Sequence, residues 1–261
     1  MNPRRTIIEI AANSVRSAIA AQEGGADRVE LCEFLEGGGV TPSFGTISLC
    51  RDKLNIPLHV LIRPRIGDFV YSEEEREIML RDISICRQLA CDGVVIGALD
   101  RYGNIDRDFC LAMREVAGDM HLVFHRAFDC ITKHDENWPI LTELGIQTLL
   151  SSGAADSAPQ GKENLRKWVQ DYPHIHIMAG AGLTPSNVAE LIKDTQVAAV
   201  HASCRRLLQS NRASDSTASI MPMQSSPLRT IAGLAPEYWQ SDLELVRAFV
   251  AAVRASDAST A

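Results

Sequence analysis

Short apolar runs recur along the chain, and the segments between them have the spacing of amphipathic helices. The runs begin near Thr6, Arg28, Pro57, Gly93, His121, Gln147, His174 and Val197. Successive starts are 22, 29, 36, 28, 26, 27 and 23 residues apart, so each interval has room for one strand and one helix. The pattern therefore predicts eight consecutive strand–helix units.

Several of these runs are apolar without interruption, as in Val60-Leu61-Ile62 and Val94-Val95-Ile96. Uninterrupted apolar strands are typical of parallel sheets, which are buried on both faces. Strands of this kind that alternate with helices indicate the α/β class. Eight units in 261 residues favour one closed (β/α)₈ barrel, a TIM barrel, as a single domain. An open doubly wound sheet is the alternative.

Helical spacing predicts helices over 13–24, 72–90, 106–116, 134–144, 158–170, 185–193 and 242–253. The clearest start is at Ser72, which forms a capping box with Glu75. At about 207–240 the chain is rich in Ser, Thr, Ala and Pro and has no sustained period. We expect a long loop there, either on the surface or as a lid over the barrel mouth.

Composition narrows the classes of function. A hydrophobic fraction of 46% supports a large core, and a net charge of −7 argues against nucleic acid or a membrane surface as a partner. The N-terminal residues lack the apolar core of a signal peptide, which predicts a cytoplasmic protein. Seven scattered cysteines without a C-x-x-C motif fit a reducing compartment and argue against a cysteine-rich zinc site.

Acidic side chains close the first two predicted strands. The strands read Ile-Glu-Ile-Ala and Val-Glu-Leu-Cys, so Glu9 and Glu30 are expected at equivalent places on neighbouring strands. Two carboxylates this close suit acid–base catalysis or a divalent metal ion. The structural alternative is a network in which Arg63 and Arg126 neutralise both carboxylates.

Basic side chains follow the third and fifth strands. Arg63, Arg65 and Asp68 lie in one turn, and the planar fork of arginine suits a carboxylate or phosphate. The fifth strand ends at His125 and Arg126. His125 is a candidate proton carrier or metal ligand, Arg126 a candidate anion ligand, and Asp129 a residue that could orient a neighbour.

A glycine turn follows the seventh strand. Gly180 and Gly182 precede Thr184, which we expect to cap a helix that has Pro185 at its first position. Backbone N–H groups at such a helix start attract anions, and barrels frequently bind phosphate after strands seven and eight. His201 and Ser203 on the eighth strand would add a metal ligand and a hydrogen-bond donor.

Cys32 is the thiol expected to point into the mouth, because it shares a strand face with Glu30. Cys32 is therefore the best candidate for a soft metal ion. Cys130 and Cys204 lie just past strand ends and stay open as candidates. The remaining cysteines fall in or beside helical patterns and are expected to be small core residues: Cys50, Cys86, Cys91 and Cys110.

Five stretches together resemble the CutC family, whose members are associated with copper homeostasis: 24–32, 38–43, 62–69, 124–129 and 178–182. The resemblance implies a cytosolic TIM barrel that forms homo-oligomers and binds and traffics Cu(I). It also implies that Cys32 is the principal thiol, with His125, His201 or Cys204 as further ligands.

The chain departs from the family pattern at two positions. Many members resemble Glu-Val-Cys at the end of the first strand, where this chain has Glu9-Ile10-Ala11, and Ile66 stands where glycine is usual. A two-thiol copper site across the first two strands cannot form without the first cysteine.

Three interpretations follow from the residues and the resemblance. The first is a copper-binding protein of copper homeostasis, and the third is a scaffold that has lost its activity. The second is an enzyme for a small anionic substrate, phosphorylated or sugar-derived. In that enzyme Glu9, Glu30 and His125 do acid–base or divalent-metal chemistry, while Arg63, Arg126 and the glycine turn hold the anion.

Overall fold

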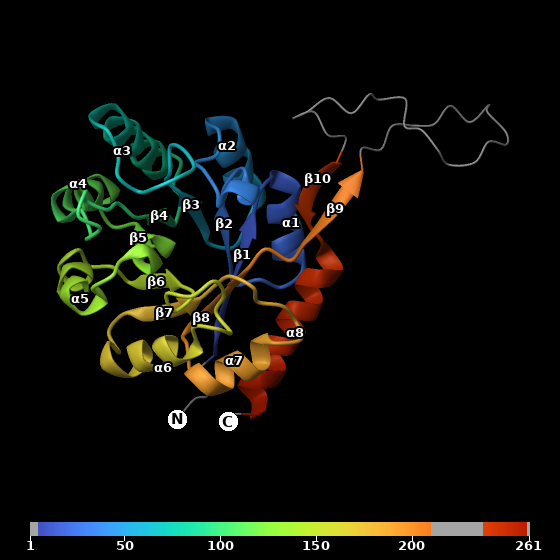
Figure 1. The fold of residues 1–261 in the computed structure, drawn as a ribbon. Helices are drawn as coiled ribbons and strands as arrows, with labels where there is room; N and C mark the ends of the chain where they lie inside the picture. Colours follow the sequence, from blue (N-terminus) through green and yellow to red (C-terminus); the bar gives the residue numbers. More distant parts are fainter. Residues whose placement is uncertain (1–4, 210–236, 260–261) are drawn as a thin grey trace, which may run out of the picture.

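The computed structural model describes residues 5–209 and 237–259, and within them eight parallel strands close into a barrel (Figure 1). Each strand begins within two residues of the predicted position, so the barrel is confirmed and the open sheet is wrong. The strands are β1 (Ile7–Ala12), β2 (Arg28–Leu31), β3 (Leu58–Leu61), β4 (Gly93–Ile96), β5 (His121–Phe124), β6 (Thr148–Ser151), β7 (His176–Ala179) and β8 (Ala199–Ala202).

Eight α-helices of the described chain surround the barrel, and none is long and apolar enough to cross a membrane. They are α1 (Val15–Glu23), α2 (Phe44–Lys53), α3 (Glu73–Gln88), α4 (Arg107–Ala117), α5 (His134–Glu143), α6 (Lys162–Asp171), α7 (Val188–Thr195) and α8 (Leu243–Ser259). The capping box predicted at Ser72 and Glu75 is present at the start of α3.

The sequence pattern missed α2 and placed the starts of α6 and α7 too early. Helix α2 buries only Ile47 and Cys50 and exposes Phe44, so its apolar positions show no clear stripe. Before α7 the Asn187 side chain accepts from the Thr184 N–H and donates to the Gly182 carbonyl. These two bonds hold a turn at 184–187, and the helix begins only at Val188.

The strands contribute to two separate apolar regions, which explains their uninterrupted apolar sequences. Outward side chains such as Val94 and Ile96 pack against the surrounding helices. Inward side chains such as Val95 and Met178 form a smaller cluster inside the barrel. Because positions two apart share a face, the strands supply both regions in alternation, except that β2 directs Arg28 and Glu30 inward.

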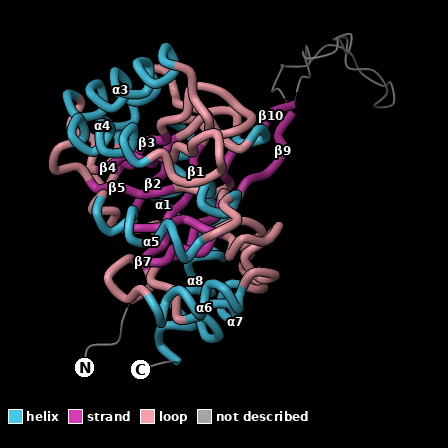
Figure 2. Tube along the Cα trace, turned by 60° about the vertical axis from the view of Figure 1, so that its left-hand side comes forward, coloured by secondary structure: helices cyan, strands magenta, loops and turns pink. Residues whose placement is uncertain are grey.

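The loop predicted at about 207–240 is wrong at its two ends. Strands β9 (Arg205–Gln209) and β10 (Glu237–Ser241) pair antiparallel and project from the barrel as a hairpin (Figure 2). The hairpin is tied to α1 and to the turn before it, since the Ser241 N–H donates to the Ser17 hydroxyl at 3.0 Å and Asn13 donates to the Trp239 carbonyl at 2.7 Å. The middle of the predicted loop, 210–236, lies outside the described residues, and the lid interpretation with it.

Candidate active site

A cavity of about 570 Å³ opens at the carboxyl ends of the strands, where (β/α)₈ barrels place their active sites. Eight of the predicted site residues line this cavity: Glu30, Cys32, Arg63, His125, Arg126, Gly182, His201 and Ser203. Glu9 lies beneath the floor and is fully buried. Arg65, Asp68 and Gly180 are not among the lining residues.

A chain of four ionisable side chains runs from inside the barrel up to the cavity. The Arg28 Nε donates to Glu9 Oε2 at 2.5 Å. The other Glu9 oxygen lies 2.7 Å from Nδ1 of His201, and His201 Nε2 lies 3.4 Å from Glu30 Oε2. The order is therefore Arg28, Glu9, His201, Glu30, with the last two side chains at the cavity wall.

The strand register places Glu9 one layer below Glu30, which corrects the expectation that they occupy equivalent positions. Glu9 lies opposite Arg28 on β2, and Glu30 lies opposite Ala11 on β1. Strands of a closed barrel are staggered along the barrel axis, so residues matched by sequence need not share a layer. Both carboxylates still meet, through the imidazole of His201 between them.

The charges around Glu9 and Glu30 give the two carboxylates very different pKa values. Burial alone would raise the pKa of Glu9, but Arg28 and His201 outweigh burial and hold this pKa far below its usual range. Glu30 has no such arginine contact. Burial raises the pKa of Glu30 to about 7, with the Glu9 charge adding to burial against the opposing effect of His201.

His201 and Glu30 are therefore poised to exchange a proton near neutral pH. Burial lowers the pKa of His201, but Glu30 and Glu9 more than offset that effect and raise it above its usual value. Glu9 remains charged and fixes the ring through Nδ1. A buried acid–base pair with one charged anchor is an arrangement that general acid–base catalysis requires.

The same side chains could hold a metal ion instead of the shared proton. Ligand atoms of Glu9, Glu30 and His201 all lie within 4.8 Å of one another. Two carboxylate oxygens and one imidazole nitrogen form a hard or borderline ligand set, which suits a divalent cation.

His125 lies in the cavity wall on β5, away from the pair. Its Nδ1 accepts the Ala127 N–H at 3.1 Å, so the ring is neutral with its proton on Nε2. Burial, together with the charge of Arg63, lowers the pKa of His125 to about 3. Nε2 is buried and has no hydrogen-bond partner among the described residues. His125 is thus a neutral donor, not a base at neutral pH.

The predicted network in which Arg63 and Arg126 neutralise Glu9 and Glu30 is wrong. Arg63 donates to three backbone carbonyls, at Gly37, Gly39 and Gly67, and so ties together the loops after β2 and β3.

Arg126 pairs instead with Asp129, at 2.8 Å from Nε to Oδ2, and donates to the Ser152 hydroxyl. The expectation that Asp129 orients a neighbour is confirmed by this pair. The Arg126 side chain remains 42% exposed at the cavity, so it can still meet a ligand.

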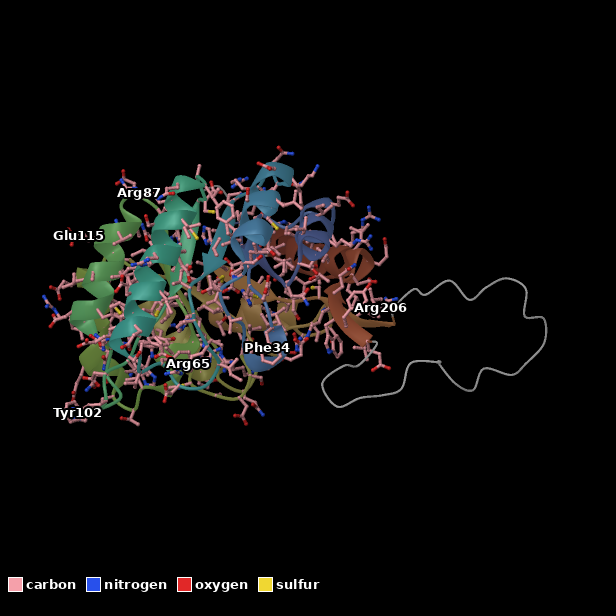
Figure 3. All side chains as sticks on the ribbon, turned by 90° about the horizontal axis from the view of Figure 1, so that it is seen from above. Phe34, Arg65, Arg87, Tyr102, Glu115 and Arg206 are labelled. Carbon is pink, nitrogen blue, oxygen red and sulfur yellow. The ribbon has the colours of Figure 1, made fainter. Side chains whose placement is uncertain are left out.

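Three predicted anion ligands have structural roles outside the cavity. Arg65 binds Asp68 and Glu75, and its side chain is labelled in Figure 3. Asp68 is largely exposed. At Gly180, a Cβ atom would come within 2.6 Å of Leu150, so this glycine permits close packing of β7 on β6.

The glycine turn presents loop N–H groups to the cavity, not a helix start. Ala181 and Gly182 both have a left-handed backbone, with φ of 74° and 73°, and both line the cavity with Leu183. No acceptor within the described residues pairs with the N–H groups of Gly182 and Leu183. Successive free N–H groups in a turn form a concavity that favours anions.

Cys32 reaches the cavity as predicted, but as a deeply buried thiol. Its sulfur lies 3.8 Å from the Ala12 carbonyl, and it is the sole thiol among the lining residues. Burial, together with the Glu30 carboxylate, raises the pKa of Cys32 well above its usual value. Cys204, the other predicted sulfur ligand, does not line the cavity.

Two functional residues escaped the sequence analysis. Arg28, the partner of Glu9, was noted only as a strand start, although it stands two residues before Glu30 on the same strand face. Arg205 lines the cavity from β9, where it donates to Glu36 and stacks on Trp239. An arginine inside an apolar strand run was the available signal for Arg28.

Three histidines inside the barrel predict a loss of stability in mild acid. Burial, with the charge of a nearby arginine, lowers the pKa of His59 to about 3, of His121 to about 4 and of His125 to about 3. The unfolded chain binds protons at these residues below about pH 6.5, while the native protein does not. The free energy of unfolding should therefore fall by about 1.4 kcal/mol per pH unit for each histidine between roughly pH 6 and 4.

Urea denaturation at several pH values tests this expectation. His121→Gln should flatten the pH dependence, whereas the same change at the exposed residue His174 should leave it as in the parent protein. An equal slope in all three proteins would contradict the prediction.

The fold and the cavity define a class of protein: a (β/α)₈ barrel with an ionisable ligand site at the carboxyl ends of its strands. Within that class, the family model of the CutC family matches residues 6–206. The chain belongs to the CutC family.

Sequence relatives agree with this assignment. A CutC family protein from Xanthomonas campestris pv. campestris is 43% identical over 244 residues, which cover 93% of this chain and 97% of the relative. One from Xylella fastidiosa is 46% identical over 206 residues, 78% of this chain and 77% of the relative.

Solved structures agree as well. A CutC protein from Streptococcus agalactiae, provisionally named for copper homeostasis, has 30% identity and a TM-score of 0.73 over 76% of this chain and 98% of that one. Phosphoribosyl anthranilate isomerase from Thermotoga maritima, at 13% identity, has a TM-score of 0.58 over 96% of this chain and 99% of that one, which shows the shared fold alone.

Proposed function

We propose that this CutC protein is an enzyme that moves a proton on a small anionic molecule bound at the barrel mouth. Glu30 and His201 are the acid–base pair, and Glu9 and Arg28 position His201 from below. The observation that carries the proposal is the chain of ionisable side chains itself, in which His201 is hydrogen-bonded to Glu9 at 2.7 Å and forms an ion-pair contact with Glu30 at 3.4 Å.

The charge of the cavity supports an anionic ligand. Arg126 and Arg205 are partly exposed at its wall, with 42% and 30% of their side chains accessible. Gly182 and Leu183, whose N–H groups have no acceptor among the described residues, line the same cavity. A phosphorylated or sugar-derived molecule would place its anionic group against these donors and its reacting carbon near Glu30.

Binding measurements test the anionic class. Ribose 5-phosphate should raise the melting temperature of the protein, while ribose at the same concentration should not. A ligand at about 100 times its Kd stabilises the native state by about 2.7 kcal/mol. Arg126→Gln should weaken the shift, and Arg107→Gln, a surface change on α4, should not. Equal shifts with ribose, or an undiminished shift in Arg126→Gln, would contradict an anion site.

A divalent cation at Glu9, Glu30 and His201 is a second candidate, favoured by their convergence within 4.8 Å. The ion would polarise a substrate oxygen, which is a role distinct from proton transfer. Equilibrium dialysis against Mn²⁺ distinguishes the two: metal chemistry requires one bound ion that His201→Asn removes.

Copper at the mouth fits the donor set poorly. Cu(I) favours sulfur ligands, and Cys32 is the sole thiol among the described residues that line the cavity, where Ala11 of the neighbouring strand offers no second sulfur. Titration with Cu(I) tests the family expectation directly. Tight binding abolished by Cys32→Ser would restore copper as the ligand of the mouth.

We further propose a cytoplasmic location, which the seven free cysteines support because such thiols persist in reducing compartments. Assembly into homo-oligomers, implied by the family resemblance, stays a prediction that sedimentation velocity can test.

A further inference from the structure

Two buried thiols meet at the end of the barrel opposite Cys32. Cys86 lies in the last turn of α3 and Cys91 just before β4, and neither residue is more than 5% exposed. The Cys91 N–H donates to the Cys86 carbonyl at 3.0 Å, and the Ala90 N–H donates to the Arg87 carbonyl at 3.1 Å. These two bonds form a Schellman motif, which brings the side chains at its two ends together.

The two thiols perturb each other's pKa in opposite directions. Cys86 lowers the pKa of Cys91, and Arg51 acts in the same direction, against the burial that raises it. Cys91 and burial together raise the pKa of Cys86. A third thiol, Cys50 of α2, is fully buried, and burial together with the nearby Cys91 raises its pKa to about 11.

The chain itself shows what this motif needs for packing alone. The same pair of backbone bonds closes α1 and α5. There the two contacting residues are Ala21 with Ala26 and Leu141 with Ile146, which are plain apolar pairs. Packing at these helix ends therefore requires only apolar contact. The pair at the end of α3 offers two sulfur atoms that can act as metal ligands, which packing does not require.

We propose that Cys86 and Cys91 bind one soft monovalent metal ion at the amino-terminal end of the barrel. On binding, each thiol releases its proton to solvent and forms one sulfur–metal bond, while the ion keeps its charge and oxidation state. Thiolate ligands select Cu(I) over harder cations. Arg51, which pairs with Asp92 beside Cys91, supplies positive charge to the thiolates.

The ion has a short route to the sulfur atoms. Cys91 is 5% exposed and follows Ala90, which is exposed and holds the left-handed position of the motif at φ 54°. Movement of this one turn would open the pair without disturbing the strands.

Titration of the full, reduced chain with Cu(I) under anaerobic conditions tests the site, with bicinchoninate as the competing ligand. We expect one tightly bound Cu(I) per chain. Cys86→Ala/Cys91→Ala, which copies the alanine pair after α1, should lose that binding. Cys32→Ala and the buried-thiol control Cys110→Ala should retain it. Binding unchanged in the double variant, or lost instead in Cys32→Ala, would overturn the proposal.

A second measurement needs no variant. Bound Cu(I) should protect Cys86 and Cys91 of the parent protein from alkylation by N-ethylmaleimide in urea, as mapped by mass spectrometry of the peptides. Protection of Cys32 instead, or a Cys86–Cys91 disulfide formed on exposure to Cu(I), would contradict a thiolate metal site. Zn²⁺ bound in place of Cu(I) would contradict the monovalent assignment.

Discussion

Arg28→Met should lower the free energy of unfolding by about 3–5 kcal/mol, the largest loss of stability that we expect from one substitution in this barrel. Glu9 is fully buried, and Arg28 is its closest cationic partner at 2.5 Å. Without the guanidinium, the carboxylate either stays charged in an apolar interior or takes up a proton, and both outcomes cost free energy. Urea denaturation at pH 7 measures the loss.

A double variant separates the unpaired charge from lost packing. Arg28→Met/Glu9→Gln removes both charges, so it should recover much of the stability lost in Arg28→Met. Arg107→Met, which breaks the exposed pair with Glu143, should change stability by no more than about 1 kcal/mol. The pKa of Glu9 is depressed in the native protein, so the stability that Arg28 contributes should disappear as pH falls below 4.5. A small loss in Arg28→Met at pH 7 would show that Glu9 does not depend on this arginine.

The barrel could be predicted from sequence because its periodicity repeats eight times and each repeat agrees with the others. The start of α3 could also be predicted, because Ser72 has the spacing of a capping box. Helix α2 was missed because it lies against the barrel through few residues, so its burial leaves little trace in the pattern. Strands β9 and β10 were missed because each pairs only with the other, across a long sequence separation.

The residue types of the site could be predicted from the sequence, but the contacts between its charged side chains could not. Strand ends reliably gave the inward side chains, including Glu30 and His201. Which charges meet depends on the stagger between strands, and the sequence carries no local signal for that stagger. Sequence reasoning therefore assigned Arg63 to the carboxylates, whereas Arg28 performs that role and Arg63 binds loop carbonyls.

The inward residues of the barrel lie in two layers that differ in their electrostatic role. Below the cavity, Arg28 and Glu9 are buried as a fixed ion pair, and His59 is buried beside them as a neutral ring. At the cavity, burial raises the pKa of Glu30 to about 7, and Glu30 and Glu9 raise the pKa of His201 against the effect of burial. The ion pair of the lower layer fixes the position of His201, while Glu30 in the upper layer can gain or lose a proton near pH 7. Proton transfer at neutral pH benefits from such an arrangement.

Glu30→Gln should reduce kcat by roughly 100- to 10,000-fold on any substrate that the barrel turns over, with a much smaller effect on binding. Glutamine keeps the size and hydrogen-bonding capacity of the side chain but cannot exchange a proton. The parent activity should depend on a group with a pKa of about 7, the value to which burial and Glu9 raise Glu30. That limb of the pH–rate profile should be missing from the residual activity of the variant.

Cys32→Ser is the matched control for Glu30→Gln, since Cys32 shares the strand face and lines the same cavity. It should leave kcat and the pH–rate profile close to those of the parent enzyme. Glu9→Gln should act differently from both, because Glu9 touches no ligand and works through Nδ1 of His201. It should shift the neutral limb of the profile to lower pH, since the Glu9 charge that helps to raise the pKa of Glu30 is gone. Full activity in Glu30→Gln, with an unaltered profile, would remove Glu30 from the chemistry and leave the divalent-cation site as the remaining account of this carboxylate.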